Sequence, residues 1–224
     1  MHALDLDYML GLVPIILGYV PLTIGMALTA MAGALVLASL MAVERVVRVP
    51  VLDLFVQLFI SFFRGTPLLV QLFLIYYGLP QILPVLAGIN GVTAAIIGLT
   101  LHFSAYMAES IRAAIMGVDR SQWEAAQAVG MTQTQSMRRI ILPQAARVAA
   151  PPLVNYFIDM IKSTSLAFTL GVTEMMGATQ KEAAGSFLYF EAFLVVAMLY
   201  WGIVEILSVL QKALERRLNK ALVR

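Results

Sequence analysis

An apolar run from about Leu17 to Val43 is the feature that most restricts what this chain folds into. The run is long enough for an α-helix to cross a hydrocarbon core of ~30 Å. The first basic residue, Arg45, follows the run, whereas Asp5 and Asp7 precede it. Because Lys and Arg accumulate on the cytoplasmic side of membrane helices, the run is predicted to be a transmembrane helix with the N-terminus outside.

The composition extends this prediction to the whole chain. Only 12% of the 224 residues are charged and 61% are hydrophobic, whereas a soluble domain carries about 25% charged residues. The chain, residues 1–224, is therefore predicted to be one all-α polytopic transmembrane domain. Its five transmembrane helices are predicted at about residues 17–43, 52–82, 93–116, 151–170 and 188–210. The C-terminus is then cytoplasmic, together with every Lys and Arg except Lys162 and Lys181.

The residues that many chemistries require are missing from the sequence. There is no cysteine, and the two histidines, His2 and His102, are too few for a histidine metal cluster. No Gly-x-x-x-x-Gly-Lys-Ser/Thr motif occurs, so the chain itself is not expected to hydrolyse ATP. The basic residues are scattered along the membrane edges, unlike a nucleic-acid-binding face. We therefore expect no catalytic residue, no bound metal or cofactor and no nucleic-acid partner.

The second predicted span is interrupted by the tetrapeptide Arg64-Gly65-Thr66-Pro67. Gly and Pro in succession predict a break in a helix. The preceding segment, Val51 to Phe63, is too short to cross a membrane alone. It is predicted to be either an interfacial helix or the first part of the span.

A polar stretch between two apolar runs, Arg120 to Pro143, contains the sharpest local signals. Ser121 and Glu124 have the spacing of a capping box, in which the hydroxyl caps a backbone N–H and the glutamate reaches back. A helix of roughly residues 122–129 is predicted to follow. Gly130 is predicted to end it in the left-handed conformation that glycine tolerates best.

Thr132 and Gln135 repeat the capping pattern and predict a second helix, which kinks or restarts at Pro143. The predicted topology places this helix–glycine–helix unit in the cytoplasm. The small side chains of Ala125 and Ala126 suit insertion of the first helix into a groove of another protein. The alternative is a solvated loop that the capping residues merely fold.

This stretch resembles the EAA loop of ABC-importer permeases in both residues and spacing. The residues that carry the match are Glu124, Ala125, Ala126, Gly130, Leu142 and Pro143. The segments FFRGTPLLVQLFLIYYGLP and KSTSLAFTLGVTEM also look like permeases of the polar amino-acid uptake family. The resemblance implies a type I ABC importer permease fold, in which the EAA loop, residues 120–143, couples the permease to a cytoplasmic ATPase.

The resemblance also implies the partners. They are two ATPase subunits that bind ATP and Mg²⁺, a second permease (a copy of this chain or a sister chain), and an extracytoplasmic substrate-binding protein. The complex is expected among the lipids of a bacterial cytoplasmic membrane. Two rival classes are a self-contained channel or secondary transporter and a membrane scaffold or sensor. The first leaves the cytoplasmic EAA loop without a purpose, and the second leaves the intramembrane charges unexplained.

Two polar stripes are predicted inside the membrane. One lies on a single face of the third span and the other on the fourth span, because their members are three or four residues apart. The stripes are His102, Tyr106 and Glu109, then Asn155, Asp159, Lys162 and Ser163. Charges within a membrane face partners or water. Either Lys162 pairs with Glu109 or Asp159 and holds the two spans together, or the stripes line a path for a zwitterionic substrate.

The resemblance is closest in wording to cystine permeases, which makes L-cystine the expected substrate. Glutamine, histidine and arginine remain alternatives. Many relatives carry an aspartate directly after the lysine of the fourth span, where this chain has Ser163. This departure makes a strongly cationic substrate such as arginine less expected.

Overall fold

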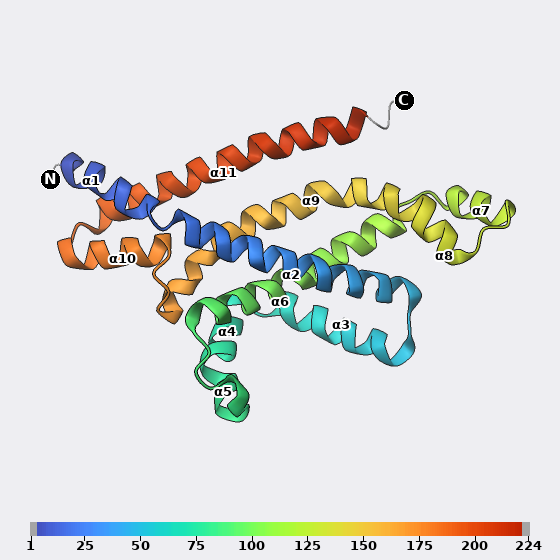
Figure 1. Ribbon diagram of the computed structural model, residues 1–224, viewed down its shortest axis with the longest axis horizontal. Coiled ribbons are helices and arrows are strands. Elements are labelled where there is room, and N and C mark those ends of the chain that lie inside the picture. The colour runs from blue at the N-terminus through green and yellow to red at the C-terminus, as the bar shows by residue number, and fades with distance from the viewer. Residues whose placement is uncertain (1–3, 221–224) are drawn as a thin grey trace.

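All secondary structure in residues 4–220, which the computed structural model describes, is helical; side chains are described to residue 216. Helices α2 (Val20–Val47) and α6 (Gly91–Met116) cross the centre of the molecule, flanked by α9 (Leu142–Ser163) and α11 (Tyr189–Lys220) (Figure 1). The shorter elements are α1 (Leu6–Leu17), α3 (Pro50–Gly65), α4 (Leu68–Phe73), the π-helix η1 (Leu74–Gly78), α5 (Leu79–Ile82), the 3-10 helix η2 (Pro84–Leu86), α7 (Arg120–Ala128), α8 (Gln133–Ser136), the π-helix η3 (Met137–Ile141), the 3-10 helix η4 (Thr164–Leu170) and α10 (Met175–Ser186). The predicted all-α fold class is confirmed for this part of the chain.

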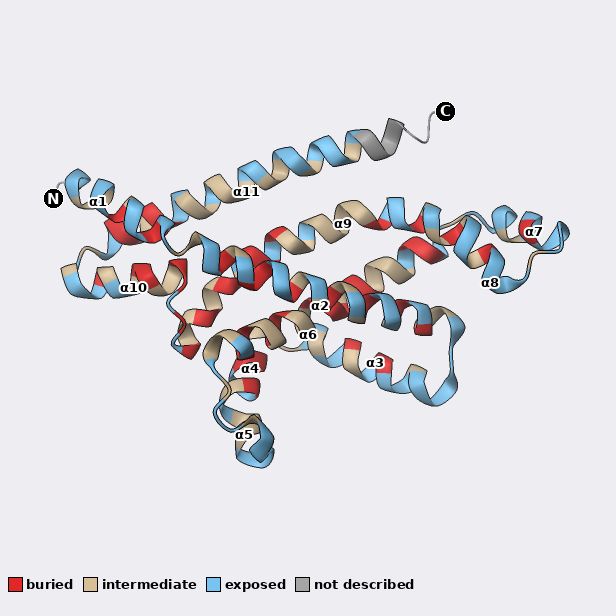
Figure 2. Cartoon of the chain, in the orientation of Figure 1, coloured by how far each residue is buried: buried red, intermediate tan, exposed pale blue. Residues whose placement is uncertain are grey.

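Small residues pack α2 against α6. Ala30, Ala34 and Ala38 are fully buried and recur every four residues, which places them on one face of α2. Such residues let membrane helices approach closely. Gly33 extends the contact, since a Cβ atom at this position would lie 2.9 Å from Cγ2 of Thr100 on α6. The α2–α6 pair is thus the tightly packed centre around which the other helices are arranged (Figure 2).

The N-terminal region differs from the prediction of one helix at 17–43. Helix α1 ends at Leu17, and α2 begins at Val20 with a proline in its first turn, where a missing N–H has no cost. The buried residues Leu12 and Ile16 pack α1 against α10 and α11. Helix α2 thus begins at Val20 rather than at 17 and continues to Val47, and a separate short helix precedes it.

The predicted break at Arg64–Pro67 is confirmed, but its geometry is sharper than an interrupted span. Helix α3 and the segment Leu68–Ile82 meet at 112°. Pro67 lacks an N–H and cannot continue the hydrogen-bond ladder of α3. Thr66 replaces one of the lost bonds, because its hydroxyl donates to the carbonyl of Phe62 at 2.8 Å. The chain thus turns away from α3 at a defined corner.

Three helices in residues 4–220 are long and apolar enough to cross a membrane, namely α2, α6 and Tyr189–Arg216 of α11. The bent pair, Pro50–Ile82, would make a fourth span. The predicted span at 151–170 differs from the structure. Helix α9 already begins at Leu142 and continues into the 3-10 helix η4. It is not among the helices that are long and apolar enough to cross a membrane.

The two ends of the molecule differ in character. Helices α7 and α8 protrude at one end, where the α2–α3 corner also lies and toward which α11 runs (Figure 1). Helices α1 and α10 occupy the other end. The first end carries basic residues at Arg45, Arg48 and Arg120, which matches the predicted cytoplasmic side.

Candidate functional site

The start of α7 differs from the predicted capping box. The helix begins at Arg120, two residues earlier than expected, and Asp119 is its cap residue. The Asp119 carboxylate accepts a hydrogen bond of 2.8 Å from the N–H of Ser121, and this bond lowers the pKa of Asp119 below its usual value. Glu124 does not reach back to Ser121 but pairs with Arg120 at 3.3 Å. Asp119, two residues before Ser121, is thus the cap residue in place of the serine.

The predicted turn after α7 is confirmed. Gly130 has a φ of +79°, and the N–H of Met131 donates to the carbonyl of Ala126 at 3.0 Å, as in a left-handed helix end. The second predicted capping box is also present, with Thr132 and Gln135 bonded reciprocally. Leu142 and Pro143 then form the first turn of α9, after the π-helix η3. The loop is therefore a folded unit, and the predicted restart at Pro143 is correct.

The outer surface of α7 is largely unoccupied (Figure 2). The side chain of Glu124 is 68% exposed, Val129 is 73% exposed, and Ala125 is also exposed. Ala126 is the exception to the prediction of a small-residue surface, because it is 1% exposed and packs inward. Helix α7 thus has an exposed ridge that is formed by Ala125 and the carboxylate of Glu124. The buried side chain of Ala126 packs the helix inward.

The predicted polar stripe of α6 is present, although its members have different partners. Nδ1 of His102 lies 2.9 Å from Oε1 of Gln71. The hydroxyl of Tyr106 donates to the carbonyl of Arg64 at 3.3 Å, and the Arg64 guanidinium lies 5.5 Å from the centroid of the Tyr106 ring. Glu109 forms an ion pair with Arg112, one turn along the same helix.

The α9 stripe faces outward from the protomer. Asn155, Asp159 and Lys162 are exposed, whereas the intervening Ile158 and Ile161 are buried. The Nζ atom of Lys162 lies 2.7 Å from a carboxylate oxygen of Asp159, with both side chains 52% exposed. Ser163 does not join this pair, since its hydroxyl donates to the Asp159 backbone carbonyl.

One prediction for Lys162 was a pair with Glu109 or Asp159 that holds the two spans together. The pair with Asp159 is confirmed, but the predicted joining of the spans is wrong. Both members of the ion pair are on α9, and Glu109 is held by Arg112, so Lys162 does not join the two spans. Helices α6 and α9 pack through buried apolar residues and are also joined by a hydrogen bond of 3.0 Å between the hydroxyls of Ser110 and Tyr156. The two stripes approach one another through the rings of Tyr106 and Tyr156, whose centroids are 6.2 Å apart.

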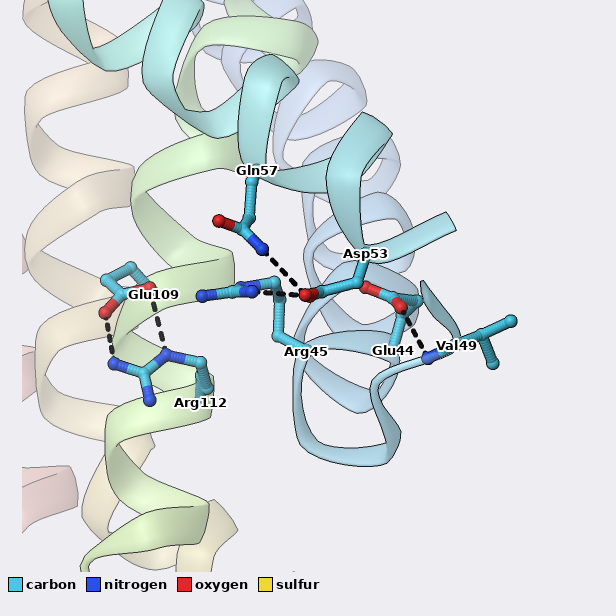
Figure 3. A network of polar contacts seen from close by, with 7 residues as sticks. All are labelled: Glu44, Arg45, Val49, Asp53, Gln57, Glu109 and Arg112. Atoms are coloured by element: carbon cyan, nitrogen blue, oxygen red, sulfur yellow. Dashed lines mark hydrogen bonds and ion pairs between the residues drawn. The ribbon is translucent and has the colours of Figure 1, made fainter. Parts of the chain in front are cut away.

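A network of charges that the sequence patterns did not reveal joins α2 and α3 (Figure 3). Arg45 of α2 pairs with Asp53 of α3, and Gln57 donates to the same carboxylate at 2.6 Å. The side chain of Glu44, near the end of α2, accepts a hydrogen bond from the N–H of Val49 in the corner. These contacts secure the corner between α2 and α3.

Comparison with known proteins identifies the family. Residues 34–220 match the family described as "Binding-protein-dependent transport system inner membrane component". The chain is 64% identical to the probable amino-acid ABC transporter permease protein PatM of Vibrio harveyi, covering 98% of this chain and 99% of that protein. It is 39% identical to the L-cystine transport system permease protein TcyB of Bacillus subtilis (strain 168), covering 92% and 88%. Relatives named for cystine are thus less similar to this chain than PatM is.

The fold matches as well as the sequence. The crystal structure of an amino acid ABC transporter with histidines superposes with a TM-score of 0.90 at 32% identity, covering 96% of this chain and 100% of that chain. The predicted family is confirmed, as is the prediction that the chain is not itself catalytic. The chain belongs to the binding-protein-dependent transport system inner membrane components, the multi-pass permeases of bacterial ABC transporters.

Proposed function

We propose that this permease imports polar amino acids and that L-cystine is its specific substrate. The names of its relatives support the amino-acid class, since both PatM and the transporter of known structure are described as amino-acid ABC transporters. The name of TcyB supports cystine. Cystine carries two ammonium–carboxylate ends, and a pair of permeases related by two-fold symmetry would offer each end the same set of groups.

The substrate path in this proposal is lined by the α6 and α9 stripes. Lys162 faces the substrate carboxylate, and the carboxylates of Asp159 and Glu109 face its ammonium group. The observation that carries this assignment is the outward position of Asp159 and Lys162, each 52% exposed, whereas the neighbouring Ile158, Met160 and Ile161 are buried. A charged group within a membrane span has a high free-energy cost unless it faces water, a substrate or a partner.

The proposed complex contains two ATPases, a binding protein and a second permease, which is either a copy of this chain or a sister chain. In it α9 serves as the fourth of the five spans of each permease, because the partner permease and a water-filled path cover its charged stripe. Helix α7 enters a cleft of the ATPase, with Glu124, Ala125 and Gly130 at the contact and with Leu142 and Pro143 anchoring the loop. The exposed ridge on α7 supports this coupling role.

Uptake into proteoliposomes tests the substrate. The permease is reconstituted with its ATPase and binding protein, and radiolabelled cystine, glutamine, histidine and arginine are compared with and without internal ATP. ATP-dependent uptake of cystine, with little uptake of arginine, is the expected result. Uptake of arginine but not cystine would contradict the cystine assignment. Uptake of all four amino acids without ATP would contradict the proposal that the chain belongs to an ATP-driven importer.

A further inference from the structure

The carbonyl groups that Pro67 leaves without a helical partner are satisfied by a glutamine. Gln71 is only 1% exposed, and its Nε2 donates to the carbonyls of Phe63 at 3.0 Å and Thr66 at 3.1 Å. In a regular helix the Phe63 carbonyl would accept the N–H of residue 67, which a proline lacks. Nε2 also lies 2.8 Å from the Thr66 hydroxyl. The Gln71 amide therefore joins α4 to the end of α3 by hydrogen bonds across the break.

These contacts fix which way the amide points. Backbone carbonyls only accept hydrogen bonds, so the side of the Gln71 amide that faces Phe63 and Thr66 has to be the NH₂ group. Its oxygen, Oε1, then faces Nδ1 of His102 at 2.9 Å. An amide oxygen also only accepts, so Nδ1 of His102 carries the proton. In the neutral imidazole the other nitrogen, Nε2, is consequently left as an acceptor.

The ring of His102 lies beside the proposed substrate path. His102 lies near the middle of α6, with its ring centroid 5.1 Å from that of Tyr106, and Tyr106 in turn lies beside Tyr156 of α9. Tyr156 is three residues before Asp159, which places the two on adjoining positions of α9. Among the described residues, Nε2 of His102 has no hydrogen-bond partner of its own.

We propose that Gln71 is a positioning residue, which holds His102 in its Nδ1–H tautomer so that Nε2 accepts a hydrogen bond from the ammonium group of the transported amino acid. This inference rests on the proposed function and adds one contact to it. A free lone pair on Nε2 attracts an N–H donor and disfavours a carboxylate. Because Gln71 also closes the α3–α4 break, the substrate contact on α6 is linked to the corner where the second span bends.

The tautomer is directly measurable, because the chain has only two histidines. A His2→Gln permease labelled with [¹⁵N]histidine is assembled with unlabelled ATPase, and the two ring nitrogens of His102 are observed by NMR. The expected spectrum shows a protonated Nδ1 and an unprotonated Nε2 whose signal shifts when cystine is added. In Gln71→Leu, the proton is expected to move to Nε2. A wild-type spectrum with the proton on Nε2 would overturn the inference, whatever the variants do.

Two substitutions of His102 separate its two nitrogens. Asparagine places an amide N–H near the position of Nδ1, whereas glutamine places its amide near that of Nε2. His102→Asn is expected to keep the thermal stability of the wild type, yet to lower the uptake rate about tenfold at saturating binding protein, since a hydrogen bond to a charged group is lost. His102→Gln is expected to lose stability while retaining more uptake per folded complex. Wild-type uptake by His102→Asn would show that Nε2 makes no substrate contact and would contradict the proposal.

The same experiments distinguish this inference from the proposed function. If wild-type vesicles import no amino acid, the proposed function fails, but the NMR spectrum still reports the tautomer. If they import an amino acid and either the spectrum or His102→Asn does not behave as expected, only the role of Gln71 and His102 is wrong.

Discussion

Replacement of Gly130 tests whether the shape of the α7–α8 loop transmits ATP hydrolysis to the membrane. Gly130 has a φ of +79°, and a Cβ atom added there would meet no atom within 4 Å. The cost of a side chain is therefore conformational rather than steric. Placing an L-residue in the left-handed region costs roughly 1–2 kcal/mol, least for asparagine and more for a β-branched residue. A difference of about 1.4 kcal/mol changes a population tenfold.

The expected order of coupling is Gly, then Asn, then Ala, then Val at position 130, with the ratio of correctly folded to misfolded loops about tenfold lower in Gly130→Val than in the wild type. The assay is substrate-stimulated ATP hydrolysis in proteoliposomes that contain the ATPase and the binding protein. Gly88→Val is the matched control, because Gly88 also has a positive φ, +84°, and no atom within 4 Å of an added Cβ. It lies between the second and third predicted spans, in a loop that the predicted topology places outside and that is far from α7 (Figure 1).

Two results would refute this reasoning. Normal coupling in Gly130→Val would mean that the left-handed turn does not matter for contact with the ATPase. Equal losses in Gly130→Asn and Gly130→Val would mean that the side chain at this position, rather than the backbone conformation, is what the ATPase detects.

Three further substitutions test other parts of the account. Asp119→Ala should increase hydrogen exchange in α7, whereas Ser121→Ala should not. Because the folded-state pKa of Asp119 is lowered, the stabilisation of α7 by this cap should be present at neutral pH and lost only as the pH falls through that lowered pKa. Equal exchange in the two variants would contradict the assignment of Asp119 as the cap. Lys162→Ala should impair radiolabelled cystine uptake with little change in melting temperature, because a half-exposed ion pair contributes about 0–1 kcal/mol; unchanged uptake would return Lys162 to a structural role. Gly33→Leu should destabilise the α2–α6 contact by roughly 1–3 kcal/mol, and an unchanged melting temperature of the detergent-solubilised complex would contradict the tight packing there.

The features that the sequence predicted well are those that depend on neighbouring residues. A left-handed glycine, a capping box and a helix break are set within a few positions, so Gly130, Thr132 and Pro67 were identified correctly. Ser121 was wrong because Asp119, two residues earlier, is an equally good cap residue, and the helix starts after Asp119. Long apolar runs likewise predicted membrane helices but not the small interruption that separates α1 from α2.

The contacts that the sequence did not predict join residues far apart in the chain. Gln71 was one polar residue in an apolar segment, and only the fold shows that it reaches the carbonyl of Phe63 and the ring of His102. Glu174 lies between the predicted fourth and fifth spans, yet it is fully buried and accepts a hydrogen bond of 3.0 Å from the hydroxyl of Tyr200. Burial of this kind follows from how α10 folds back against α11, which has no signature at short range.

Cross-linking from α7 tests the central claim, that this permease is driven by an ATPase docked on the EAA loop. The natural chain has no cysteine, so a photoactivatable cross-linker is attached to the single thiol of Ala125→Cys, with Val85→Cys, 88% exposed in the predicted external loop, as the control. The assembled transporter is irradiated and the products are identified by mass. The account predicts a covalent adduct with the ATPase from position 125 and none from position 85. No ATPase adduct from Ala125→Cys, or equal adducts from both positions, would contradict it.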